Sequence, residues 1–88
     1  MRPAVYGLWW DDATQEKLWK KHRVLSGEVG DVVLRDSKAE FRWHEDRQHG
    51  RRLLVRGRTR GGRRLIVILD PIDQDEGIWR CRTVWEER

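Results

Sequence analysis

The sequence predicts an α+β fold in which two N-terminal helices pack on a small, mainly antiparallel sheet. Helix signals lie between residues 11 and 34, whereas strand-like alternation of apolar and polar residues begins at Ala39. The chain has 88 residues, which corresponds to a single domain, residues 1–88. Because 38% of the residues are hydrophobic and 39% are charged, we expect a thin core that draws on the six tryptophans.

A short strand and a helix are expected at the start of the chain. Residues 5–9 are apolar and aromatic, which is typical of an edge strand. Asp11 or Asp12 is placed to cap the following helix, since a short polar side chain accepts a bond from the free N–H groups of the first turn. Acidic residues begin this segment and basic residues end it, an order that suits the helix dipole.

A second, shorter helix is expected after Ser26, which is the next capping candidate. Val29, Val32 and Val33 recur on one side of this helix. Since β-branched residues weaken helices, a strand over residues 29–34 is the alternative interpretation.

The remaining chain has the two-residue period of a sheet. Strands are expected over residues 39–45, 52–59, 64–70 and 78–85, with a turn at 46–50, a glycine hairpin at 60–62 and an acidic loop at 71–77. Strict alternation in the last strand places Trp79, Cys81, Thr83 and Trp85 on one face, opposite Ile78, Arg80, Arg82 and Val84. The helices are expected to cover one face of the sheet, and arginines the other.

The positive charge is concentrated in one segment. Nineteen Lys and Arg against 15 Asp and Glu give a net charge of +4, yet residues 47–64 hold eight arginines and no carboxylate. Because guanidinium groups grip phosphates with two donors, the segment predicts a nucleic-acid surface; a solvated face is the alternative. The candidate RNA-binding residues are Arg51, Arg52, Arg56, Arg64, His49 and Arg82.

Several classes of protein are disfavoured by the sequence. The longest apolar run covers about five residues, far from the ~20 of a membrane span, and the N-terminus lacks the pattern of a secretory signal. Cys81 is the only cysteine, which excludes an internal disulfide and a cysteine zinc site and suits a reducing cytoplasm. The acidic loop lacks the spacing of a calcium site, and the glycines form no phosphate loop, so we expect no metal and no cofactor.

Three segments in order resemble the BrnT-type toxins of bacterial type II toxin–antitoxin systems. They are LWWDDATQEKLWKKHRV, HGRRLLVRGRTRGGRRLIVIL and WRCRTVW, similar to the family's F-E-W-D and K-H-G-V opening, its basic strand with a G-R-T turn, and its closing strand R-I-I-S-A-R. Trp9 replaces the family's opening glutamate, Arg23 its glycine, and Trp85 a common arginine. The resemblance implies a fold similar to the RelE-like ribonuclease toxins, RNA cleavage without a metal, and a DNA-binding antitoxin partner.

The candidate catalytic residues are Arg80, His22, Lys21 and Arg58. Arg80 matches the first arginine of the family's closing strand, and Lys21 and His22 match its K-H pair. We expect Arg80, with Arg58 or Arg64, to hold the scissile phosphate while His22 or Lys21 moves a proton. A structural role for His22 is the alternative. The expected partners are RNA and the antitoxin, in a hetero-oligomer without membrane contact; the alternative function is a non-catalytic RNA- or protein-binding module.

Overall fold

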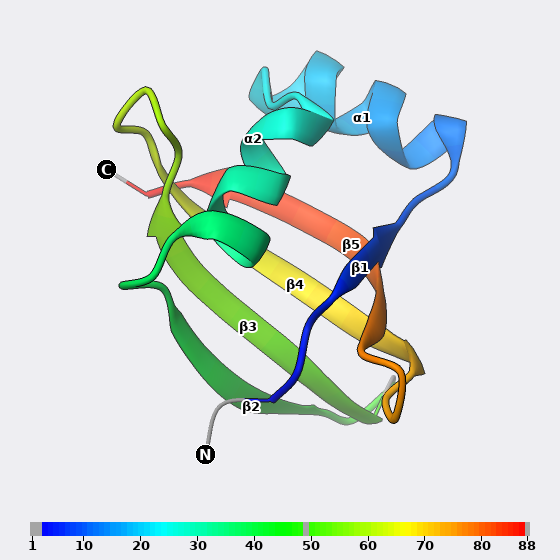
Figure 1. The fold of residues 1–88 in the computed structure, drawn as a ribbon. Coiled ribbons are helices and arrows are strands. Elements are labelled where there is room, and N and C mark those ends of the chain that lie inside the picture. The colour runs from blue at the N-terminus through cyan, green and yellow to red at the C-terminus, as the bar shows by residue number, and fades with distance from the viewer. Residues whose placement is uncertain (1–2, 49, 88) are drawn as a thin grey trace.

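The computed structural model describes residues 3–48 and 50–87. These residues form an α+β fold in which short helices pack on a five-stranded sheet (Figure 1). Its elements, in order, are β1 (Gly7–Trp9), α1 (Asp12–His22), α2 (Ser26–Gly30), the π-helical turn η1 (Asp31–Arg35), β2 (Glu40–Asp46), β3 (Gly50–Arg58), β4 (Arg64–Asp73) and β5 (Ile78–Glu86). Among the described residues, no helix is both long enough and apolar enough to cross a bilayer.

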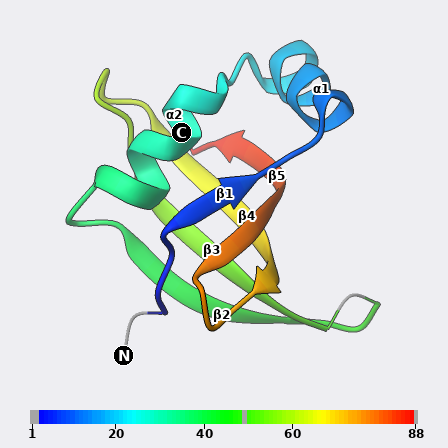
Figure 2. The ribbon, with the colours of Figure 1, turned by 45° about the vertical axis from the view of Figure 1, so that its right-hand side comes forward.

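The five strands form a single mixed sheet in the order β1-β5-β4-β3-β2. Strands β2 to β5 follow one another with antiparallel pairing, whereas β1 runs parallel to β5 (Figure 2). The predicted arrangement, two N-terminal helices on a mainly antiparallel RelE-like sheet, is therefore wrong. The edge strand expected over residues 5–9 forms as β1 before both helices, but it pairs in parallel with β5 and makes the sheet mixed, because the edge N–H and C=O groups of β5 need a partner.

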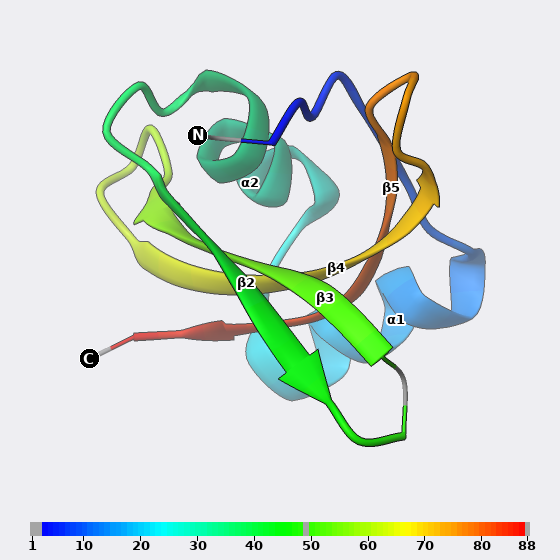
Figure 3. The same ribbon diagram turned by 90° about the horizontal axis from the view of Figure 1, so that it is seen from below.

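The helices do not cover the sheet together. Helix α2 and η1 lie over one face, and α1 runs beside β5 (Figure 1, Figure 3). Under α2 and η1 the valines Val29, Val32 and Val33 close the core, so the strand alternative for residues 29–34 is wrong. Leu18 of α1 and Val24 join this core, and the sheet supplies Leu53, Val55, Leu65, Val67, Leu69, Trp79, Cys81 and Val84.

Helix α1 has the capping expected from the sequence. Thr14 donates its backbone N–H to the Asp11 carboxylate at 2.7 Å. Hydrogen bonding by Thr14, together with the charge of nearby Arg80, lowers the pKa of Asp11. At the other end Arg23 takes the left-handed conformation, with φ of 53°, where helices usually have glycine. The second helix lacks the expected serine cap: its N-cap is Leu25, whose N–H donates to Glu28.

Strand β5 contains a bulge that changes which side chains share a face. Ile68 pairs with Thr83 and Leu69 with Cys81, so one extra residue, Arg82, stands between these pairs. Val84 therefore returns to the core beside Val67, while Trp85 faces outward beside Ile66. The two faces predicted by strict alternation are wrong beyond Cys81 for this reason.

Gly57 in β3 lets η1 and the following loop approach the sheet. A Cβ atom on Gly57 would lie 2.7 Å from Asp36 Oδ2, 3.0 Å from Val32 Cγ1 and 3.2 Å from Ala39 Cβ. The Asp36 carboxylate cannot move freely, because it accepts the backbone N–H groups of Lys38 and Arg58 at 2.9 and 2.8 Å. A side chain at position 57 therefore pushes η1 away from the sheet.

We expect Gly57→Ala to lower the free energy of unfolding by about 1–3 kcal/mol through overpacking. The matched control is Gly27→Ala in α2, where nothing lies within 4 Å of the new Cβ and a gain of about 0.5–1 kcal/mol is expected. Urea unfolding of both variants measures the difference. Equal midpoints would contradict the close approach described here.

Candidate nucleic-acid interface

The sheet has one face without a helix over β2, β3 and β4 among the described residues (Figure 3). We call this the uncovered face. The register arranges its side chains in four rows across the strands: Arg58–Arg64; Glu40–Arg56–Ile66–Trp85; Arg42–Leu54–Ile68–Thr83; and His44–Arg52, Asp70–Arg80–Trp9. The face thus combines arginines with apolar and aromatic groups, a composition found on nucleic-acid-binding sheets.

Carboxylates from other segments neutralise part of the arginine cluster. Asp70 is the centre of one group: Arg52 Nε lies 2.8 Å from its Oδ1, and Arg82 Nε lies 3.1 Å from its Oδ2. The Arg52 contact is an ion pair without hydrogen-bond alignment. Arg56 pairs with Glu87. Arg52, Arg56 and Arg82, predicted to bind RNA, therefore already hold strands together.

Arg63 joins three segments that are far apart in the sequence. Its guanidinium donates to the Glu28 carboxylate at 2.9 and 3.0 Å, to Glu86 at 3.1 Å, and to the backbone oxygens of His22 and Arg23. The bonds to Glu86 and Glu28 raise the pKa of the Arg63 guanidinium. Arg63 therefore fixes the C-terminal end of α1 and the start of α2 against β5.

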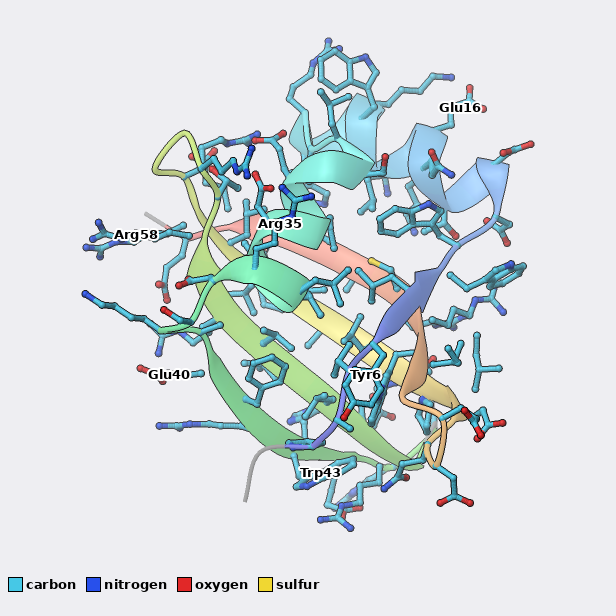
Figure 4. All side chains as sticks on the ribbon, in the orientation of Figure 1. Tyr6, Glu16, Arg35, Glu40, Trp43 and Arg58 are labelled. Atoms are coloured by element: carbon cyan, nitrogen blue, oxygen red, sulfur yellow. The ribbon has the colours of Figure 1, made fainter. Side chains whose placement is uncertain are left out.

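Arg58 and Arg64 face each other at the hairpin end of the uncovered face. They are direct cross-strand partners, and within the described residues neither side chain has an ion pair. Like charges in this position destabilise a sheet unless an anion joins them. They line a hollow of about 500 Å³ together with Asp36, Lys38, Glu40, Arg56, Gly57 and Glu87. The Arg58 side chain points outward from this corner, on the opposite side of the hairpin from α2 (Figure 4).

Lys21 and His22 lie at the same end of the sheet. They line a second hollow, of about 340 Å³, with Arg23, Arg63, Trp85 and Glu86. Arg63 directly precedes Arg64 and donates to the His22 backbone oxygen, so this hollow borders the row of Arg58 and Arg64. The backbone of His22 therefore lies against Arg63, at the end of β4 where Arg64 also stands.

Arg80 lies at the other end of the uncovered face. It pairs with Asp70, six residues along β4 from Arg64, which separates the two arginines by about 20 Å. Its guanidinium lies 3.1 Å from Asp11 and 5.1 Å from the Trp9 ring centroid. The expectation that Arg80 and Arg64 or Arg58 hold one phosphate together fails on this distance, because adjacent strands do not make opposite strand ends adjacent.

Arg51 lies at the start of β3, near the β2–β3 turn. The Arg51 guanidinium stacks 4.0 Å from the Trp43 ring centroid on the core side of the sheet, with Glu45 at 3.9 Å. Arg51 therefore does not belong to the uncovered face. His49 lies outside the described residues.

Neither a reactive thiol nor a cluster of metal ligands is present among the described residues. Burial raises the pKa of the Cys81 thiol to about 12, so it stays protonated and inert. In residues 3–48 and 50–87, no three His, Cys, Asp or Glu side chains are grouped to hold a metal ion.

Comparisons of the chain with protein-family models, with curated proteins and with solved structures give no match. The resemblance to the BrnT-type toxins therefore rests on the three sequence segments alone.

We expect Arg63→Met to lower the free energy of unfolding by about 1–2 kcal/mol, because the buried part of the side chain is kept and its charge-assisted bonds are lost. Arg60→Met in the same hairpin is the control, since Arg60 has an exposed side chain without an ion pair among the described residues. Thermal unfolding of both variants provides the measurement. An equal loss of stability in both variants would show that the bonds of Arg63 do not stabilise the fold.

Proposed function

We propose that this protein binds RNA through the uncovered face and acts as the endoribonuclease toxin of a bacterial type II toxin–antitoxin pair. One observation carries the RNA-binding part: Arg58 and Arg64 oppose each other at a hollow, with no ion pair in the described chain. A phosphate bound between them converts a repulsion into two charge-assisted contacts. The toxin part is supported by the resemblance of three segments to the BrnT-type toxins.

The proposed cleavage needs no metal ion. Arg58 and Arg64 hold the scissile phosphate and stabilise the charge that develops on it. His22 accepts the proton of the neighbouring 2′-hydroxyl, whose oxygen attacks phosphorus. The bond from phosphorus to the 5′ oxygen breaks, and that oxygen takes up a proton from the Lys21 ammonium group. Arg80, at the far end of the face, contacts RNA away from the cleaved bond.

The partner and compartment follow from the same proposal. The antitoxin, a DNA-binding protein, covers the uncovered face in a hetero-oligomer and blocks RNA, and an acidic segment suits the cations there. A cytoplasmic location is proposed because RNA is there and because the buried Cys81 is a free thiol.

A non-catalytic RNA-binding module is the second candidate function. The distance of about 20 Å between Arg64 and Arg80 favours it, since a binding face spreads its cations whereas a cleavage site concentrates them. The two candidates share the RNA contacts of Arg58 and Arg64 and differ in whether the bound RNA is cut.

Salt dependence tests RNA binding. For a single strand we expect log Kd to change with log salt with a slope of roughly 2–4 in magnitude, about 0.7 for each phosphate contact. Arg58→Gln with Arg64→Gln lowers that magnitude by about 1.4. Arg35→Gln, in η1 on the helix-covered side, leaves it unchanged (Figure 4). A slope near zero for the unsubstituted protein would overturn the electrostatic basis of the proposal.

Cleavage in the presence of a chelator distinguishes the two candidates. A toxin arrests growth when expressed alone, and its purified form cuts single-stranded RNA in EDTA. Arg64→Gln then slows cutting by about 10²–10³-fold, whereas Arg35→Gln cuts at the normal rate. Intact RNA after saturating binding by folded protein would reject the nuclease and leave the binding module.

A further inference from the structure

Two exposed tryptophans stand on the uncovered face. The Trp9 side chain is 48% exposed and Trp85 is 38% exposed, although tryptophan is usually mostly buried. Trp9 belongs to the row of Arg80 and Trp85 to the row of Arg56, two rows apart along β5. They replace residues that are charged in the family that the sequence resembles, so that resemblance does not explain them.

Each tryptophan is accompanied by cations. Arg80 is held 5.1 Å from the Trp9 ring centroid by Asp11, and the hollow of about 370 Å³ beside them is otherwise lined by Ile72 and Ile78. Trp85 shares its hollow with Lys21, whereas Arg63 in the same hollow is held by Glu28 and Glu86. An aromatic ring beside a cation suits a nucleotide, because the base stacks on the ring and the cation attracts the phosphate.

The spacing of the two tryptophans limits which bases can bind them. On β4 between them Ile66 is partly exposed, whereas Ile68 is buried, at 7% exposure. The two rings are about 13 Å apart along the strand direction, whereas neighbouring bases in a duplex are ~3.4 Å apart. They therefore cannot take adjacent stacked bases, and bases inside a duplex do not offer their faces at all.

We infer that the uncovered face selects single-stranded RNA, with one base stacked on Trp9, beside Arg80, and a second, non-adjacent base on Trp85. The strand then runs along β5 from the Trp9 row to the hairpin end, where Arg58 and Arg64 lie. The inference rests on the proposed RNA binding and adds the strandedness and the base contacts. It gives Arg80 a role in holding RNA far from Arg64.

The test uses the full chain and a labelled RNA of about 12 nucleotides, single-stranded or annealed to its complement. Fluorescence anisotropy is expected to show tighter binding of the single strand. Trp9→Ala and Trp85→Ala each weaken it roughly 5- to 100-fold, and Trp9→Phe restores most of the affinity. The control is Trp19→Ala. Trp19 is a similarly exposed tryptophan on α1 beside Arg23, and its substitution is expected to leave the RNA affinity unchanged.

The outcomes separate this inference from the proposed RNA binding. Loss of affinity in the tryptophan variants with an unchanged salt slope supports stacking, since the slope reports phosphate contacts only. The stacking alone is overturned if folded Trp9→Ala and Trp85→Ala bind RNA with unchanged affinity while Arg58→Gln still weakens binding. Equal affinity for duplex RNA also overturns it. Failure of the unsubstituted protein to bind any RNA overturns both.

Discussion

The bulge in β5 determines which residues the sheet buries and which it presents. Arg82 is the extra residue, and its guanidinium is directed to Asp70, which also holds Arg52. Beyond the bulge Val84 lies in the core and Trp85 outside. With strict alternation the core would instead have to bury Trp85 and lose Val84. The composition of the uncovered face therefore depends on one irregular position, fixed by an ion pair.

The arginines divide by their position in the sheet. In the middle of the strands, partly buried guanidiniums have carboxylates supplied by neighbouring strands, because an uncompensated charge there is costly. At the hairpin end, Arg58 and Arg64 are exposed to water, which makes their mutual repulsion tolerable. The groups left for a ligand are thus those whose charge solvent already screens, and their binding energy is sensitive to salt.

Rigid elements carry the candidate site. Gly57 lets η1 pack closely on β3, and Arg63 ties the ends of α1 and α2 to β5. Arg58 and Arg64 consequently stand on strands, and Lys21 and His22 stand at the end of α1 that Arg63 fixes, rather than on a long loop. Such support positions groups before a ligand arrives, which lowers the entropic cost of binding.

Local sequence patterns were sufficient to predict several of the secondary-structure elements of this protein. The acid-first, base-last segment with Asp11 as cap formed α1, the glycines at 61 and 62 formed the hairpin, and the apolar run from Leu65 formed a buried strand. Composition also located the arginines. The sequence could not supply the parallel pairing of β1 with β5, the bulge, or the carboxylates that neutralise Arg52, Arg56 and Arg63. Those depend on contacts between segments distant in the chain, which no short-range periodicity encodes. For the same reason only the tertiary structure separated Arg80 from Arg64 and placed Trp9 and Trp85 on one face.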